Sequence, residues 1–248
     1  MNTPQSRVEC AECDAIVSVD EDVADTRTPC SACGSTKRAY TATARPMQPT
    51  NYVLDTFIAY KLSQLTVCGV SDLPNDGNWL NTFILRSIFH FQLDPKARAF
   101  LFNFLRRIEG ASAAYREARA NLQEYVNTPR NVVSPYFKAL TQLEICISQC
   151  YQGYELLATA LNAKLYDHGS GSPVARLQMV YVDSKHMDRM IHGEKLPAEA
   201  TSGIWITNTS IESSRGEISF TELHELLTAM HSLAEKLCTA KEPVANEG

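Results

Sequence analysis

The feature that most constrains this chain is a pair of cysteine knuckles near its N-terminus, CAEC at 10–13 and CSAC at 30–33. Together they form C-x2-C-x16-C-x2-C, a spacing typical of a four-cysteine zinc site. A segment of about 35 residues buries too little apolar surface to fold alone, so we expect a bound metal ion to stabilise it. We therefore predict a zinc ribbon over residues 1–45. Its Zn²⁺ ligands would be Cys10, Cys13, Cys30 and Cys33.

Alternatives to a zinc site exist for the four cysteines, and the net charge of the ribbon indicates which class of molecule it contacts. A redox pair or two disulfides would also use four cysteines, but both fit a cytosolic chain less well than zinc does. Gly34 follows the second knuckle, where such a turn often needs a positive φ. Residues 1–45 carry five Lys and Arg against seven Asp and Glu, a net charge of −2. We favour a structural or protein-contact ribbon over one that reads nucleic acid, because acidic groups repel phosphates.

The composition of the whole chain narrows its class further. It has 248 residues, a formal net charge of −5 and 44% hydrophobic residues, which is ordinary for a globular protein. The acidic balance argues against bulk DNA binding and against coating of an anionic membrane, but it leaves room for a local RNA site. No run approaches the ~20 apolar residues of a membrane span, and the start lacks the order of a signal peptide. We expect a cytoplasmic protein with no membrane partner.

Helical periodicity dominates the rest of the chain. Apolar stripes and helix-start signals predict helices at about 51–67, 78–92, 95–126, 135–163, 173–192 and 220–238. Short β-prone runs at 203–219 predict a hairpin before the last helix. We therefore expect a mainly α fold, with a helical bundle over 46–240 and a disordered polar tail at 241–248.

Several helix starts can be located from local signals. Three of them have an N-cap residue followed by proline at the first helical position. They are Asp94-Pro95, Ser134-Pro135 and Ser172-Pro173. A fourth start, from Ser219 to Glu222, has the pattern of a capping box.

Several segments of the helical part, taken in order, resemble HEPN-like helical domains of bacterial proteins. The matching pieces lie within 134–238 and are Leu140 to Glu144, Gly169 to Ser172, Arg176 to His186, Trp205 to Asn208 and Ile218 to Leu223. HEPN domains are α-helical bundles, often dimeric, and many are metal-independent ribonucleases in toxin, abortive-infection and CRISPR systems. The resemblance implies a HEPN-like bundle, a homodimer or another protein partner, and RNA as a ligand.

The resemblance also singles out one helix for any chemistry. The ribonuclease signature of the family is an Arg and a His a few residues apart, whereas nine residues separate Arg176 from His186. The Asn of the family pattern is Asp183 here. We therefore expect a non-catalytic HEPN-like module that binds a partner, a nucleotide or RNA. The alternative is a metal-independent HEPN-type endoribonuclease, in phage defence or a toxin system.

The candidate site residues share one side of the predicted helix 173–192. At about 100° per residue, Asp183 and His186 fall within about 80° of Arg176. Asp183 could then orient the His186 imidazole for acid/base work, and Arg176 could neutralise a phosphate. In the structural alternative, Arg176 and Asp183 pair with each other or cap neighbouring groups, and His186 is a hydrogen-bonded core histidine. The sequence leaves both interpretations open.

Overall fold

The computed structural model describes residues 7–18, 29–41, 50–74, 77–89, 94–129, 132–167, 170–198 and 200–239. The chain divides into two compact units, residues 1–48 and 49–248. The boundary that we predicted after residue 45 and the tail predicted at 241–248 both lie outside the described residues.

The N-terminal unit contains a three-stranded antiparallel sheet. Its strands are β1 (Arg7–Cys10), β2 (Ile16–Ser18) and β3 (Arg38–Thr41), in the spatial order β2-β1-β3. The central strand, β1, pairs along its whole length with β3. The first knuckle begins at the last residue of β1, so the sheet fixes the position of Cys10.

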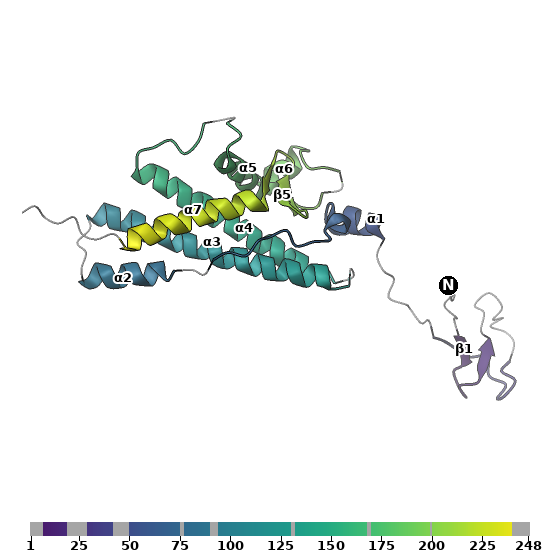
Figure 1. Cartoon of the computed structure of the whole chain (residues 1–248). Helices are drawn as coiled ribbons and strands as arrows, with labels where there is room; N and C mark the ends of the chain where they lie inside the picture. The colour runs from purple at the N-terminus through teal and green to yellow at the C-terminus, as the bar shows by residue number, and fades with distance from the viewer. Residues whose placement is uncertain are drawn as a thin grey trace, which may run out of the picture. The chain divides into compact units, whose positions relative to one another are not determined.

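The second unit is built on two long helices, α3 (Pro95–Asn127) and α4 (Ser134–Ala160). A short connection makes them antiparallel neighbours, and they pack along their lengths (Figure 1). Two further helices, α2 (Trp79–Phe89) and α7 (Phe220–Thr239), pack on α3 and on each other. The mainly helical fold predicted from the apolar stripes is confirmed.

These helices enclose a continuous apolar core. Its fully buried members include Tyr115 of α3, Leu143 of α4 and Leu227 of α7. Burying one leucine side chain stabilises the fold by about 1.5–3 kcal/mol, so the core dominates the stability of this unit. Within the described ranges, no helix has both the length and the apolar character needed to cross a bilayer.

Most of the predicted helix starts are confirmed. The Asp94 carboxylate accepts two backbone N–H bonds from the first turn of α3, and the Ser172 hydroxyl accepts one from the helix that it precedes. Ser219 and Glu222 exchange the two hydrogen bonds of a capping box. The prediction for Ser134 is wrong. It is the first residue of α4 and makes no capping bond, because the residue before it already has nearly helical angles (φ −93°, ψ −8°).

The prediction of one continuous helix at about 51–67 is wrong. A helical turn, α1 (Asn51–Val53), continues into a π-helical turn, η2 (Leu54–Ile58), and a 3₁₀ turn follows, η3 (Leu62–Gln64). Between η2 and η3, Lys61 has a left-handed φ of 58°, which interrupts the helical conformation.

The strap that follows, residues 65–74, runs without regular structure and is held by distant residues. The Asn208 side chain accepts hydrogen bonds from two successive backbone N–H groups of the strap, at 2.9 and 3.0 Å. At Gly69 a Cβ would lie 1.9 Å from the Asn208 carbonyl oxygen, so only glycine fits. These long-range contacts override the local helical pattern.

A second three-stranded antiparallel sheet stands where we predicted a hairpin. Its strands are β4 (Ile204–Ile206), β5 (Ser210–Ser213) and β6 (Glu217–Ser219), in the order β4-β5-β6. The extra strand arises because the buried Ile-Trp-Ile run of β4 pairs fully with β5. The sheet packs against α5 (Pro173–Lys185), which is followed by the short α6 (Met187–His192).

Candidate functional site

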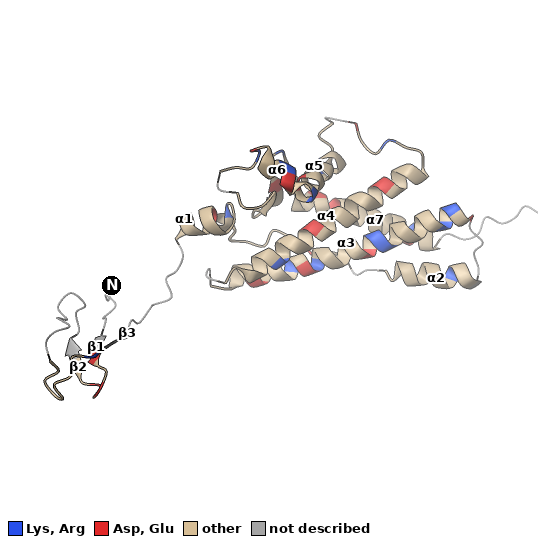
Figure 2. Ribbon diagram, turned by 180° about the vertical axis from the view of Figure 1, so that it is seen from behind, with Lys and Arg blue, Asp and Glu red and all other residues tan. Residues whose placement is uncertain are grey.

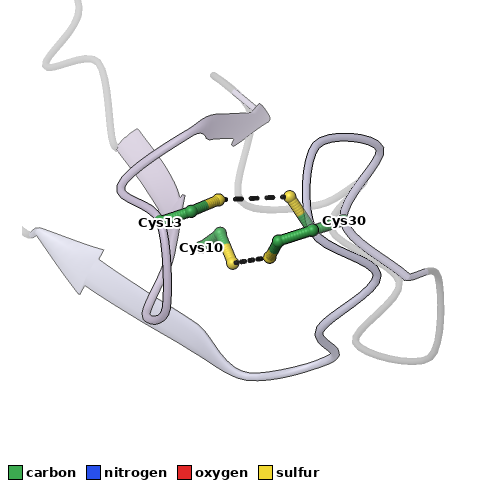
Figure 3. Close-up of side chains that lie close together, drawn as sticks. Cys10, Cys13 and Cys30 are labelled. Carbon is green, nitrogen blue, oxygen red and sulfur yellow. Dashed lines mark hydrogen bonds between the residues drawn. The ribbon is translucent and has the colours of Figure 1, made fainter.

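The four predicted metal ligands converge at one point of the N-terminal unit. Their Sγ atoms all lie within 4.8 Å of one another. The Sγ atoms of Cys10 and Cys33 are 3.4 Å apart, and those of Cys13 and Cys30 are 3.8 Å apart (Figure 3). A tetrahedron of Zn–S bonds of about 2.3 Å has edges of about 3.8 Å, so the cluster has the dimensions of a four-thiolate metal site.

The two knuckles share one backbone geometry. The Asp14 N–H donates to the Cys10 carbonyl at 2.9 Å, and the Gly34 N–H donates to the Cys30 carbonyl at 2.7 Å. Both donors have a positive φ, 57° at Asp14 and 73° at Gly34. The expectation for Gly34 is confirmed, whereas the equivalent role of Asp14 was missed, although Asp tolerates this region better than most residues.

Backbone N–H groups within each knuckle stabilise its first thiolate. Hydrogen bonds from the backbone of Ala32 and Cys33 lower the pKa of Cys30 to about 6. A backbone hydrogen bond from Glu12 lowers the pKa of Cys10 in the same way. Thiolates are the form of cysteine that binds metal. All eight cysteines are free, so the disulfide alternative is not adopted.

The helix predicted at 173–192 is interrupted at His186. α5 ends at Lys185, His186 has φ −117° and ψ 41°, and α6 begins at Met187. The prediction of one continuous helix is therefore wrong. Periodicity could not reveal the break, because neither proline nor glycine marks it.

Beside this break lies a cavity of about 210 Å³, formed by α5, α6 and the β5–β6 turn. Three of its lining residues are cationic and one is anionic, a net charge of +2 with histidine neutral. The lining residues are Val182, Asp183, His186, Arg189, Met190, Lys195 and Arg215. Figure 2 shows the charged residues that gather around α6. The exposed side chains of Arg189 and Lys195 form no ion pair with any other described residue.

Asp183 is the buried acid of this cavity, with 1% of its surface exposed. The Arg215 Nε donates to its Oδ1 at 2.6 Å, and the Nη2 of the same guanidinium contacts that oxygen too. Among the described residues, the Oδ2 of Asp183 has no hydrogen-bond partner. Burying a carboxylate costs several kcal/mol unless it is paired, so Arg215 is its necessary counter-ion.

The other two predicted site residues have different surroundings. The Arg176 guanidinium pairs with Glu222 of α7 and contacts the Gly171 carbonyl, so it does not line the cavity. The alternative in which Arg176 pairs with Asp183 is therefore wrong. The half-buried His186 ring makes no hydrogen bond to the rest of the described chain, so it is not a hydrogen-bonded core histidine either. Thus Asp183 and His186 line the same cavity, whereas Arg176 lies outside it.

Sequence reasoning missed all three cations of the cavity. Arg189 lies beyond the unforeseen helix break, and Lys195 lies in the loop that follows α6. Arg215 is 32 residues from Asp183 in the sequence, and only the fold brings them together. The one available signal was an arginine beside Gly216, in the turn of a predicted hairpin.

Other hollows of the helical unit have a different character. One of about 470 Å³ lies between the ends of α3, α4 and α7 and is lined mainly by Leu, Phe and Ala. A groove of about 450 Å³ between α4 and α5 contains Glu144, whose pKa is raised by burial. Neither hollow is lined by several cations.

Comparison of the chain with family models, with curated proteins and with solved structures gives no match.

Proposed function

We propose that this protein joins a zinc ribbon to a HEPN-like helical domain that binds RNA or a nucleotide through its phosphates, without cleaving it. The observation that carries the proposal is the cavity beside His186, where Arg189, Lys195 and Arg215 surround one buried acid. This local excess of positive charge stands out in a chain of net charge −5. Arginine and lysine side chains are the usual partners of phosphate oxygens.

The surroundings of the cavity favour binding over chemistry. Asp183 is paired with Arg215 and makes no hydrogen bond to the His186 ring. The carboxylate is thus not placed to orient the imidazole as an acid/base pair. The resemblance to HEPN domains supports RNA as the ligand, and the departure from the family's Arg/His spacing supports a non-catalytic role.

RNA binding can be tested by fluorescence anisotropy with a labelled single-stranded RNA at several salt concentrations. Removal of one cation that binds a phosphate should weaken binding and reduce the slope of log K against log[salt] by about 0.7. We expect this result for Arg189→Ala and Lys195→Ala. The matched controls are Arg106→Ala and Lys236→Ala, which remove exposed charges that do not line the cavity. Equal binding by all four variants would refute the proposal.

The alternative function is a metal-independent HEPN-type endoribonuclease, in phage defence or a toxin system. It is favoured by one observation, that His186 and Asp183 line the same cavity. The test is cleavage of a mixed RNA pool without added metal, by the wild type and by His186→Ala. Products with 2′,3′-cyclic phosphates that are lost in the variant would replace the binding proposal with this one.

We propose Zn²⁺ as the ion of the four-cysteine cluster, supported by its dimensions and by its all-sulfur ligand set. Such thiolates stay reduced in the cytoplasm, which is the compartment that we propose. Metal analysis of the purified protein should give one zinc ion per chain. Cys10→Ser should lose the ion, and Cys68→Ser, outside the cluster, should keep it. An equal zinc content in both variants would contradict the assignment.

We also propose that the helical domain forms a homodimer, as the resemblance implies. The supporting observation is an exposed apolar stretch of α2, where Ile84, Leu85 and Ile88 are accessible, the last by 67%. Light scattering coupled to gel filtration should report a dimer. Ile88→Lys should yield a monomer, whereas Ile145→Lys, at an exposed position of α4, should not. A monomeric wild type would refute this proposal and would favour another protein as the partner.

A further inference from the structure

We propose that the groove between α4 and α5 binds a guanine base, in the same RNA or nucleotide whose phosphate occupies the cavity beside His186. This inference rests on the proposed phosphate-binding function and names the part of the ligand that a second site selects. Three features carry it: the uncharged polar lining of the groove, an accessible carboxylate oxygen of Glu144 and the position of the groove beside the cavity.

The lining of the groove suits an uncharged ring with hydrogen-bonding edges. Its volume of about 450 Å³ lies within the ~300–1,000 Å³ of typical small-molecule sites. One acid, Glu144, and one cation, Lys185, give the lining no net charge. All of the other lining residues except Ile145 carry a hydroxyl or an amide group. A nucleobase pairs with such groups along its edges, whereas an apolar ligand would leave them unpaired.

Glu144 supplies an acceptor that is open to a ligand. The Ser184 hydroxyl donates to its Oε1 at 3.1 Å. Its Oε2 has no partner in the described part of the chain and, unlike the Oδ2 of Asp183, is not shielded from solvent. Burial raises the pKa of the Glu144 carboxyl, so its charged form is incompletely solvated and is stabilised by a further donor. The groove therefore favours a ligand that brings N–H donors to this carboxylate.

Two glutamines of the groove add groups of both kinds. The Gln149 Oε1 accepts a hydrogen bond from Arg107 at 2.8 Å, which leaves its side-chain N–H groups as donors. The Gln152 Nε2 donates to the Ser148 hydroxyl at 3.0 Å, which leaves its Oε1 as an acceptor. The groove thus presents donors as well as acceptors to a base.

Guanine has the Watson–Crick edge that matches this arrangement. The edge carries two adjacent N–H donors, at N1 and N2, and one acceptor, O6. The Glu144 carboxylate can accept from both donors, and Gln149 or Lys185 can donate to O6. Adenine and cytosine each place a ring acceptor, which the carboxylate repels, beside a single amino group. Uracil offers one N–H between two carbonyls. Only guanine therefore brings two donors to the acid.

The groove and the cavity lie on either side of the last turn of α5. Ser184 and Lys185 line the groove, whereas their neighbours Asp183 and His186 line the cavity. A helix with its side chains is about 10–12 Å across, so a short single-stranded segment can place a phosphate in the cavity and a base in the groove. The two hollows then recognise different parts of one ligand.

The experiment is an anisotropy titration with short labelled uridine strands that differ at one central nucleotide. That nucleotide is guanosine, adenosine, cytidine, uridine or inosine, which lacks the N2 amino group of guanosine. We expect the guanosine strand to bind about tenfold more tightly than the adenosine, cytidine and uridine strands. The inosine strand should bind several-fold more weakly than the guanosine strand. Strong competition by GMP would identify a free nucleotide as the source of the base, and weak competition would identify an RNA segment.

Two variants connect the selectivity to the groove. Glu144→Gln keeps an acceptor for Ser184 but replaces the other oxygen with a donor. It should bind the guanosine strand no more tightly than the uridine strand. The matched control is Glu124→Gln, which changes an exposed acid of α3 that does not line the groove and should keep the preference.

A second measurement uses no phosphate. Guanosine, added to the full-length protein, should shift amide signals of residues 141–152 and 181–185 in NMR spectra, and adenosine should not. The same signals should stay in place when guanosine is added to Glu144→Gln.

The outcomes separate this inference from the function on which it rests. If the guanosine and uridine strands bind equally, and Arg189→Ala weakens both, the phosphate-binding function stands and the guanine site is wrong. If guanosine shifts the groove signals but Arg189→Ala binds every strand as the wild type does, the guanine site stands and the phosphate-binding function is wrong. If guanosine shifts no signal and no strand binds, both are wrong.

Discussion

In the ribbon, Cys10 and Cys30 are the only buried side chains among the residues whose burial is described, whereas the helical domain buries a continuous apolar core. Even Ile16, a strand residue of the ribbon, is 58% exposed. The hydrophobic effect therefore contributes little to the stability of that part of the ribbon, whereas it dominates the stability of the helical domain. The two regions should fail under different treatments, and each treatment should spare the other region.

The largest effect should follow removal of the metal. Apparent binding energies of structural zinc are about 10–16 kcal/mol, and that energy is folding energy for a small metal domain. After chelation, amide signals of residues 7–18 and 29–41 in NMR spectra should collapse, and the thermal unfolding of the helical domain should stay unchanged. A large fall in the melting temperature of the helical domain would contradict the independence of the two regions, because it would show that the stability of one depends on the other.

Truncation of the helical core should give the reverse pattern. Leu143→Ala should lower the free energy of unfolding of the helical domain by about 2–5 kcal/mol in urea titrations followed by circular dichroism. The zinc content should not change. Ile145→Ala lies on the same helix at a 40% exposed position and should change stability by less than about 0.5 kcal/mol. Similar losses in both variants would contradict the burial pattern.

Acid should weaken the helical domain partly through Glu222. Burial raises the pKa of this carboxyl, but hydrogen bonds from Arg176 and Ser219 outweigh burial and lower it from 4.5. A lowered folded-state pKa stabilises the fold above the unfolded-state value, and this stabilisation is lost as pH falls through the folded-state value. Urea titrations between pH 7 and 3 should show a smaller decline in Glu222→Gln. An unchanged decline would show that other carboxylates dominate it.

The smallest effect concerns helix capping. Ser172→Ala removes the N-cap of α5 and should cost about 1 kcal/mol of stability. Ser134→Ala is the matched control, because this serine is also followed by proline but makes no capping bond. A destabilisation of similar size in both variants would mean that the serine-proline pattern matters for some other reason.

Local patterns predicted well wherever local physics decides the structure. The knuckle spacing predicted the cluster of Cys10, Cys13, Cys30 and Cys33, because chelation constrains short segments. Long apolar stripes predicted α3, α4 and α7, because each stripe must be buried against a neighbour. Caps were predicted where a polar side chain satisfies nearby N–H groups, as at Asp94.

Predictions failed where residues far apart in the sequence decide the conformation. Asn208 anchors the strap at residues 65–74, and no local sequence pattern in that segment predicts this contact. The cavity beside His186 depends on the pairing of Arg215 with Asp183 and on a helix break without proline or glycine. The sequence could supply Asp183 and His186 as candidates, but only the fold could supply their cationic neighbours.

The break at His186 has a consequence for how such a site could arise or disappear. On an unbroken helix, Arg189 would lie about 120° around the axis from Asp183, and the two could not face one small hollow. The interruption redirects the chain, so that two sides of the segment that lie about 120° apart on a continuous helix become adjoining walls of the hollow. No contiguous signature encodes that arrangement. A single substitution that restored helical continuity could erase the hollow while every charged residue stayed in the sequence.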